Sequence, residues 1–539
     1  MKKIMNKNNR VHLEIQTHRK NPIGVIRSTY RDDSNSIKHQ TVSRITGLDL
    51  MQLKMIQAAL QNNVMLKSDF QVVSSREYGA SYAVYSLAKE LNLDKIISSR
   101  TGEAWVKDSI AMIVGRLVYA GSKLSLSHCA SFSALWEICG NPDEEIDVDT
   151  HCYESMDKLL ARQENIQKAL VKRHLTEGSL VLYDITSSYL EGEYKNSELV
   201  EFGYNRDRKR GHEQIVIGLL CNKDGCPVAV EVFAGNTKDE TTVLNKIKEL
   251  QKKYGIESVI FVGDRGMVTQ AKYEKIDHNT VKVISALTHD NIRDLCEKGV
   301  VQLGLFDENS VVELYDGNMR YCLCKNPQMT EKETKTRRAL LDKTAAELNK
   351  VTGSTRKCKN SKEIRAGKVV NKYEMGKFVL FHGTGNDLKW SFDQEKIDQE
   401  QLLDGCYIIY TDICKDEMTA IETVKNYKSL ISVEQAFRCL KTTQLEIRPI
   451  YHKRDDRIKC HVFLCMLAYY LMWHMKQRLQ PLFNEDGAGK DRKYTFKYII
   501  ESLKSIRSEL ISIESQTASV ISTPSDEQLK ILSLLKIAL

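Results

Sequence analysis

Prolines, paired cysteines and long apolar runs are all scarce in this chain of 539 residues. With only 7 prolines and 28 glycines, against 42% hydrophobic and 28% charged residues, the composition excludes collagen-like repeats and low-complexity disorder. The longest apolar run, 462–473, has 12 residues, which is short of the ~18 that suggest a membrane span. We therefore expect a globular protein with a buried helix in that segment.

The cysteines and the N-terminal segment both predict a reducing compartment. Positive charge near the N-terminus is not followed by an apolar stretch that could form the core of a signal peptide, so we expect a cytoplasmic protein. The 14 cysteines contain no CxxC pair. Cys322 and Cys324 form a lone CxC, and Cys460, His461 and Cys465 fall in an apolar helical stretch. We expect reduced core cysteines rather than disulfides or zinc sites.

Positive charge is unevenly distributed along the chain. The segment 332–377 has 14 Lys or Arg against 5 Asp or Glu, a local excess of +9 beside a net charge of +8 for the whole chain. A second basic cluster, "NRDRKRGH" at 205–212, contains Arg206, Arg208, Lys209 and Arg210. One such run is typical of a solvated face, but two together favour nucleic acid as a partner, because phosphate neutralisation needs clustered cations.

Changes in hydrophobic periodicity predict a mixed α/β protein. Apolar residues repeat at three or four from about 51 to 175, whereas tight apolar runs from 178 onward predict strands and helices in the order βββ-α-β-α-β. A break of more than a hundred residues inside such a unit is typical of an inserted subdomain. The expected regions are a β-hairpin module (1–50), a helical region (51–175), an α/β core (176–290), an inserted basic subdomain (291–405), the closing strand and helices of the core (406–480) and a C-terminal helical tail (481–539).

Two aspartates mark the ends of predicted strands. Asp184 stands in "LVLYDITSSY", where the apolar run turns polar, and Asp264 repeats the arrangement in "VIFVGDRGM". Either could cap a turn. Together they would converge on one place, which is unfavourable without a cation, and a divalent metal with hard oxygen ligands would resolve that conflict.

A third carboxylate lies in "YKSLISVEQAFRCLKTT" at 427–443, which we expect to be one helix. At 100° per residue, one stripe about 80° wide places Glu434 among four other side chains: Tyr427, Leu430, Arg438 and Lys441. Glu434 could instead form an ordinary i,i+4 pair with Arg438, worth a few tenths of a kcal/mol. Asp412 in "YIIYTDI" is an alternative third ligand, because it also follows a predicted strand.

These segments resemble the DDE transposases of bacterial insertion sequences: "YDIT", then "GDRG", then Glu434 after a long insertion. More narrowly, the chain is similar to the insertion-sequence-four group, whose last carboxylate lies in Tyr-x2-Arg-x3-Glu-x6-Lys. Tyr427, Glu434 and Lys441 match this spacing, whereas Leu430 replaces the Arg. The resemblance covers roughly residues 178 to 475.

The resemblance implies an RNase H-like catalytic core in which Asp184, Asp264 and Glu434 bind two Mg2+ ions, with Mn2+ as a substitute. It implies cut-and-paste transposition of double-stranded DNA, in which terminal inverted repeats are bound by the N-terminal regions, cleaved and transferred by a homodimer. DNA phosphates would be contacted by these residues: Tyr427, Arg438, Lys441, Arg265 and the basic cluster at 206–210. Trp390 in the insertion is a candidate for stacking on a flipped base.

Two alternatives remain. A nuclease on the same fold would cut without joining, and the long helical N-terminal region disfavours it because such an enzyme needs no recognition of DNA ends. A transposase-derived DNA-binding protein without catalysis would be expected to have lost a carboxylate, and none is lost here. A nucleotide-binding enzyme is disfavoured because "GTGNDL" at 383–388 lacks a third glycine.

Overall fold

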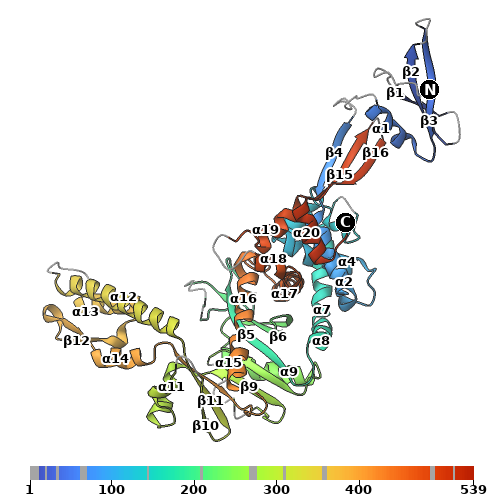
Figure 1. Cartoon of the computed structure of the whole chain (residues 1–539). Helices are drawn as coiled ribbons and strands as arrows, with labels where there is room; N and C mark the ends of the chain where they lie inside the picture. The colour runs from blue at the N-terminus through green and yellow to red at the C-terminus, as the bar shows by residue number, and fades with distance from the viewer. Residues whose placement is uncertain are drawn as a thin grey trace, which may run out of the picture. The chain divides into compact units, whose positions relative to one another are not determined.

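The computed structural model describes residues 11–17, 21–31, 36–60, 70–142, 145–204, 206, 211–265, 267, 273, 276–307, 311–354, 361–485, 492–513 and 516–539. The chain divides into two compact units (Figure 1). The first comprises Met1–Ala80, Ser131–Ala134 and Glu501–Lys530, and the second comprises Ser81–Ala130, Leu135–Ile500 and Ile531–Leu539.

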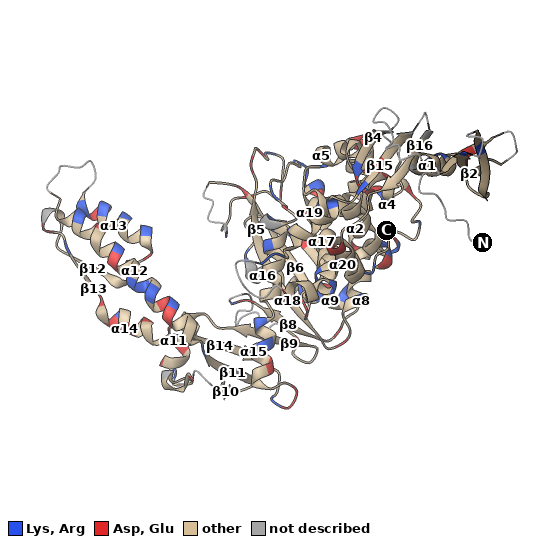
Figure 2. Cartoon of the chain, turned by 45° about the horizontal axis from the view of Figure 1, so that its top comes forward, with Lys and Arg blue, Asp and Glu red and all other residues tan. Residues whose placement is uncertain are grey.

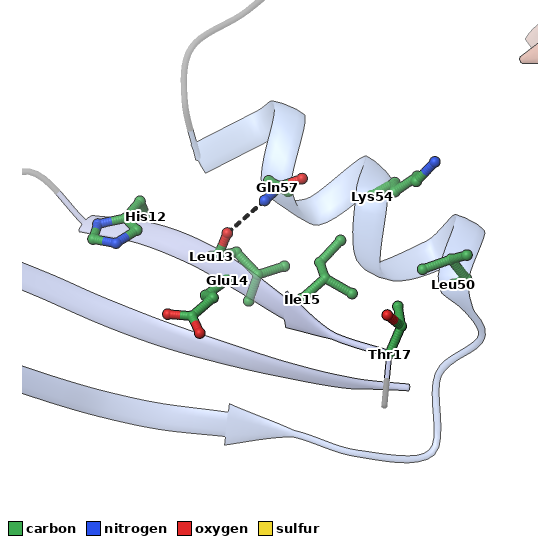
Figure 3. Close-up of a pocket in the computed structure, with 8 residues that line it drawn as sticks. All are labelled: His12, Leu13, Glu14, Ile15, Thr17, Leu50, Lys54 and Gln57. Carbon is green, nitrogen blue, oxygen red and sulfur yellow. Dashed lines mark hydrogen bonds between the residues drawn. The ribbon is translucent and has the colours of Figure 1, made fainter. Parts of the chain in front are cut away.

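The first unit begins with a three-stranded antiparallel sheet where a hairpin was expected. Its order is β1 (Val11–Gln16), β2 (Ile23–Arg31) and β3 (Ile37–Ile45), and α1 (Leu50–Leu60) packs against β1. Leu13, Gly24 and Leu53 are buried between sheet and helix. Figure 3 shows the pocket beside α1, where the Gln57 side-chain amide donates to the Leu13 carbonyl at 2.7 Å.

A second sheet in this unit joins parts of the chain that are far apart in sequence. Its order is β16 (Gln516–Ile521), β15 (Arg507–Ile513) and β4 (Phe70–Glu77), all antiparallel. The prediction of helices alone for 51–175 and 481–539 is therefore wrong at these strands. Because β4 pairs with a strand more than 400 residues later, no local pattern reveals the pairing.

Two parts of the chain are mainly helical, one between β4 and β5 (Ser179–Tyr189) and the other from residue 455 to the C-terminus. Their bounds are α2 Gly79–Glu90, α3 Leu93–Ile97, α4 Ala104–Val118, α5 Lys123–Ser127, α6 Leu135–Ile138, α7 Ser155–Ala161 and α8 Gln163–His174; the C-terminal helices are α17 Asp455–Arg478, α18 Gln480–Glu485, α19 Phe496–Lys504 and α20 Asp526–Leu535. Helix α17 packs against α4, α7 and strand β7. It is long and apolar enough to cross a membrane, yet 83% of its most apolar window is buried within the fold, which confirms the predicted core helix.

An eight-stranded mixed sheet forms the centre of the second unit, in the order β10-β11-β14-β9-β8-β5-β6-β7. Strands β5, β8 and β9 run parallel, and the remaining neighbours pair antiparallel. The strand bounds are β5 Ser179–Tyr189, β6 Gln214–Asn222, β7 Pro227–Ala234, β8 Val259–Gly263, β9 Val281–Ala286, β10 Val312–Asp316, β11 Met319–Lys325 and β14 Cys406–Thr411. The accompanying helices are α9 Asp239–Lys252, α11 His289–Glu297, α15 Ala420–Lys428 and α16 Ile431–Arg438.

The expected order of strands and helices agrees with this sheet in its first half. β5, β6 and β7 follow one another as antiparallel neighbours, and most of their residues are buried. The helix expected at 268–276 lies almost entirely outside the described residues. The mixed α/β class predicted from the sequence is therefore found.

The insertion is shorter than the expected 291–405. β10 and β11 fall inside that range but extend the large sheet through hydrogen bonds between β11 and β14. The added subdomain contains α12 (Pro327–Thr352), α13 (Lys362–Tyr373), β12 (Val379–His382), β13 (Lys389–Phe392) and α14 (Gln394–Leu402). It has a small core of its own, which includes Leu348, Ala366 and Val370.

Basic side chains recur along α12 and α13 of this subdomain (Figure 2). Several of the cations pair with carboxylates: Lys335 contacts Glu331, Arg337 contacts Asp404, Lys372 contacts Glu347 and Lys377 contacts Glu400. Part of the local positive charge is thus neutralised within the protein.

Candidate active site

The register of the large sheet places two aspartates side by side. In the parallel pair β5/β8, Tyr183 is opposite Gly263, so Asp184 and Asp264, the next residue on each chain segment, occupy neighbouring positions. Adjacent strands lie about 4.8 Å apart. β8 ends at Gly263, whereas β5 continues to Tyr189, so Asp184 stands in the middle of its strand and not at its end.

Electrostatic interactions show that three carboxylates share this place. The pKa of Asp184 is raised to about 7, chiefly by burial, and the negative charges of Asp264 and Glu434 contribute to this increase. The backbone N–H of Ile185, which donates to Asp184 Oδ1 at 2.7 Å, and the nearby charge of Arg206 act in the opposite direction. The folded protein thus holds mutually repelling carboxylates together, an arrangement that a divalent cation would stabilise.

Glu434 reaches this site from α16, which packs against β5 (Figure 1). The helix buries Val433, Ala436 and Phe437 and leaves Glu434 exposed in its first turn. One face of the helix therefore fixes its position on the sheet, while the acidic side chain stays accessible.

Tyr427, on α15, contacts the second aspartate. Its hydroxyl donates to Asp264 Oδ1 at 3.3 Å. Burial raises the pKa of Tyr427, with the charge of Asp264 adding to the effect and that of Arg265 opposing it. Tyr427 is therefore a protonated hydrogen-bond donor that orients Asp264, a role that the sequence did not reveal.

The single helix expected over 427–443 is broken in the structure. α15 ends at Lys428, α16 begins at Ile431, and a π-helical turn covers Cys439–Thr443. Leu430 lies in the joint and is only 7% exposed, so it packs into the protein while Glu434 and Arg438 are exposed. The helical-wheel projection assumed a continuous axis, and the joint turns Leu430 into the core. Arg438 remains exposed in the last turn of α16, and Lys441 is partly exposed in the π-helical turn.

The basic cluster contributes one described residue, because Arg208, Lys209 and Arg210 lie outside the described residues. The Arg206 guanidinium donates to the Ile185 carbonyl at 2.8 Å, and its backbone N–H donates to Ser187 Oγ at 3.0 Å. Arg206 thus supports strand β5 next to Asp184. Arg265 follows Asp264 and is exposed.

Asp412, the alternative third ligand, is held elsewhere on the sheet. It lies 2.7 Å from His278 Nδ1 and accepts the Val283 backbone N–H at 2.8 Å. β14 is two strands from β8, and the register leaves Asp412 about 10 Å short of the level of Asp264 along the strands. The geometry therefore favours Glu434 over Asp412 as the third member of the site.

Three oxygen donors with mutual repulsion fit a hard divalent cation. Among the described residues, Asp184, Asp264 and Glu434 are not a set whose ligand atoms all lie within 4.8 Å of one another.

Trp390, considered for base stacking, lies on β13 of the insertion. Its indole N–H donates to Asn349 Oδ1 at 3.2 Å, and its ring packs edge-on against Phe392 with 5.0 Å between centroids. The side chain is half-buried and supports the small core of the insertion, so its part in DNA binding stays a prediction.

Comparison with known proteins agrees with these observations. A family model described as "Transposase DDE domain" matches residues 176–471, which include all three carboxylates. Among solved structures, the chain is similar to the piggyBac transposase synaptic complex with hairpin DNA, with 11% sequence identity, a TM-score of 0.36, and coverage of 79% of this chain and 76% of that chain. No curated protein matches the chain.

Proposed function

The chain belongs to the transposase DDE domain family, and on this premise we propose that it is a DNA transposase that cleaves DNA and transfers the cut strand. One observation carries the proposal: Asp184 and Asp264 occupy neighbouring sheet positions with Glu434 close enough for its charge to raise the pKa of Asp184. Phosphoryl transfer with a divalent metal needs a carboxylate cluster of this kind.

We further propose that β5–β9 form an RNase H-like core with two Mg2+ ions, for which Mn2+ substitutes. Three antiparallel strands followed by two parallel ones, with Asp184 on the first and Asp264 after the fourth, support this assignment. When bound, two such ions would activate an attacking water and stabilise the leaving oxygen of an in-line displacement.

The chain's own residues would orient this chemistry. Tyr427 holds the Asp264 carboxylate through its hydrogen bond, and the buried face of α16 holds Glu434 against β5. Arg265 and Arg438 are exposed near the carboxylates on their own segments, and with Lys441 they would contact DNA phosphates, which sets register rather than sequence preference.

The proposal extends to the finer identity of the protein. Tyr427, Glu434 and Lys441 keep the spacing of the insertion-sequence-four signature, which supports membership of that group. Terminal inverted repeats would be bound by the first 175 residues, a homodimer would hold two transposon ends, and the protein would act in the bacterial cytoplasm on the chromosome.

The test is Mg2+-dependent nicking of a DNA duplex that carries the inverted repeats found beside the gene. The purified full chain is compared with Glu434→Gln and, as a matched control, Asp412→Asn. We expect Glu434→Gln to lose nicking and Asp412→Asn to retain it; full activity in Glu434→Gln would contradict the assignment. Joined products in the presence of a target plasmid distinguish a transposase from a nuclease that only cuts.

A further inference from the structure

A second group of metal-ligating side chains lies in the second unit, outside the carboxylate site. His174 is the last residue of α8, Cys226 lies in the turn between β6 and β7, and His474 is on α17. Their ligand atoms all lie within 4.8 Å of one another, and this is the only such group of three among the described residues. Three elements from distant parts of the sequence therefore converge here.

Hydrogen bonding leaves part of this group unsatisfied. His474 Nε2 is buried and has no hydrogen-bond partner, and burial of a polar atom without a partner destabilises the fold. His174 Nε2 lies 3.0 Å from the Tyr470 hydroxyl. If His174 donates that hydrogen bond, its Nδ1 keeps a free lone pair, the arrangement in which an outer partner orients a metal-binding imidazole.

The protonation states suit coordination at the imidazoles. Burial lowers the pKa of His474 to about 4, with the charges of His174, Arg478 and Arg173 adding to the effect, and burial also lowers the pKa of His174. Both rings are therefore neutral near pH 7, as ligands must be. Burial raises the pKa of the Cys226 thiol, so a metal would have to displace that proton.

The two neighbouring arginines are engaged with other acceptors. Arg478 forms a bidentate contact with Glu90, at 2.8 and 2.5 Å. Arg173 donates to the Leu91 carbonyl at 2.6 Å. Their charges weaken the binding of a cation, and a Cys226 thiolate would offset part of this repulsion.

We propose that His174, Cys226 and His474 bind one zinc ion that joins α8 and α17 to the β6–β7 turn. Two imidazoles and one thiolate match the preference of zinc for nitrogen and sulfur ligands, and the fourth tetrahedral position is left for water. This site is separate from the proposed DNA chemistry, because no member contacts Asp184, Asp264 or Glu434.

Zinc content and cobalt spectroscopy of the purified full chain test the proposal. We expect about one zinc per chain after dialysis without chelator, and a thiolate-to-cobalt charge-transfer band when Co2+ replaces the zinc. Cys226→Ser removes the band and the zinc. The matched control Cys221→Ser, a buried free cysteine on β6 of the same hairpin, retains both.

Two further measurements keep the test decisive. If Cys226→Ser does not fold, the cobalt spectra of the wild-type chain and of His474→Gln decide, because a band from this site is lost when His474 is replaced, whereas a band from another cysteine is retained. Asp184→Asn must keep its zinc; loss of zinc in that variant would place the metal at the carboxylates and overturn the proposal. Wild-type protein that holds no zinc and shows no band with Co2+ overturns it as well.

Discussion

Asp184 and Asp412 are carboxylates of the same eight-stranded sheet, but their surroundings differ. Asp412 lies against His278 Nδ1 and accepts the Val283 N–H. Asp184 accepts one backbone N–H, from Ile185, and faces the charges of Asp264 and Glu434, which together with burial move its pKa to about 7. Asp412 therefore has hydrogen-bond partners within the protein, whereas the cluster around Asp184 would be stabilised by an added cation.

This difference in surroundings is the reason for proposing Asp184, and not Asp412, as a metal ligand. Both residues follow or interrupt an apolar strand, so strand position alone does not distinguish them. Repulsion between carboxylates destabilises the folded protein. Such clusters are typical of functional sites, where a bound cofactor or substrate reduces the repulsion. Substitutions at Asp184 and Asp412 should therefore differ in their effects on activity and on stability.

Replacing Asp184 has the largest expected effect. Asp184→Asn keeps the size of the side chain but removes a metal-binding charge, and we expect Mg2+-dependent nicking to fall by about 10^3-fold or more. Because the substitution also removes repulsion, the metal-free variant should have a higher unfolding midpoint than wild type at pH 8. A gel assay and calorimetry in EDTA measure the two effects. If Asp184→Asn nicked DNA at the wild-type rate, the proposed role of Asp184 as a metal ligand would be wrong.

Tyr427→Phe tests the hydrogen bond that orients Asp264. Loss of an outer partner of a metal ligand typically costs 10–100-fold in activity or metal affinity, and we expect a decrease in that range. Tyr315→Phe is the matched control, since Tyr315 is 57% exposed on β10. Mg2+ titration of the nicking rate makes the comparison, and equal rates for both variants would refute the orienting role.

The pH dependence follows from the raised pKa of Asp184. Protons compete with the metal below pH 7, so nicking at low Mg2+ should increase about fivefold from pH 6 to pH 7 and level off near pH 8. In metal-free protein the sign is reversed. A carboxyl with a raised folded pKa contributes stability that is present below its ordinary value of 3.8 and is lost as the pH rises through about 7. Unfolding midpoints that increase over this range in EDTA would contradict the burial of Asp184.

Asp412→Asn has the smallest expected effect on activity. The nicking rate per folded molecule should stay within about twofold of wild type, because Asp412 lies about 10 Å from the level of Asp264 along the strands. Loss of its contact with His278 should instead reduce the free energy of unfolding by about 1–3 kcal/mol. Denaturant titration measures this, and an activity loss as large as that of Asp184→Asn would place Asp412 in the active site.

Local pattern predicted much of the large sheet and identified three carboxylates as candidates, two of which the sheet register places side by side. Asp184 and Asp264 were selected because each interrupts an apolar run, and Glu434 because it stands on an otherwise amphipathic helix. The prediction of one continuous helix over 427–443 is wrong, because a two-residue joint that contains the buried Leu430 separates α15 from α16. Helical-wheel reasoning has no information about such a joint.

Other features were beyond local pattern. The strand Phe70–Glu77 lies in a segment expected to be helical, and its partner is Arg507–Ile513. The cysteines were expected to be plain core residues, yet Cys226 lies beside His174 and His474, which are 52 and 248 residues away in sequence. Spacing motifs detect metal ligands only where the ligands are close in sequence.

The sequence by itself determined which segments form strands and helices in the core, and which acidic residues interrupt them, because hydrophobic periodicity is a local property of the chain. Packing of distant segments places Tyr183 opposite Gly263, so that Asp184 lies beside Asp264, and brings His278 Nδ1 to 2.7 Å from Asp412. Strand register and side-chain burial depend on packing between distant segments. Packing between distant segments therefore places Asp184 near Asp264 and Glu434, and gives Asp412 hydrogen-bond partners within the protein.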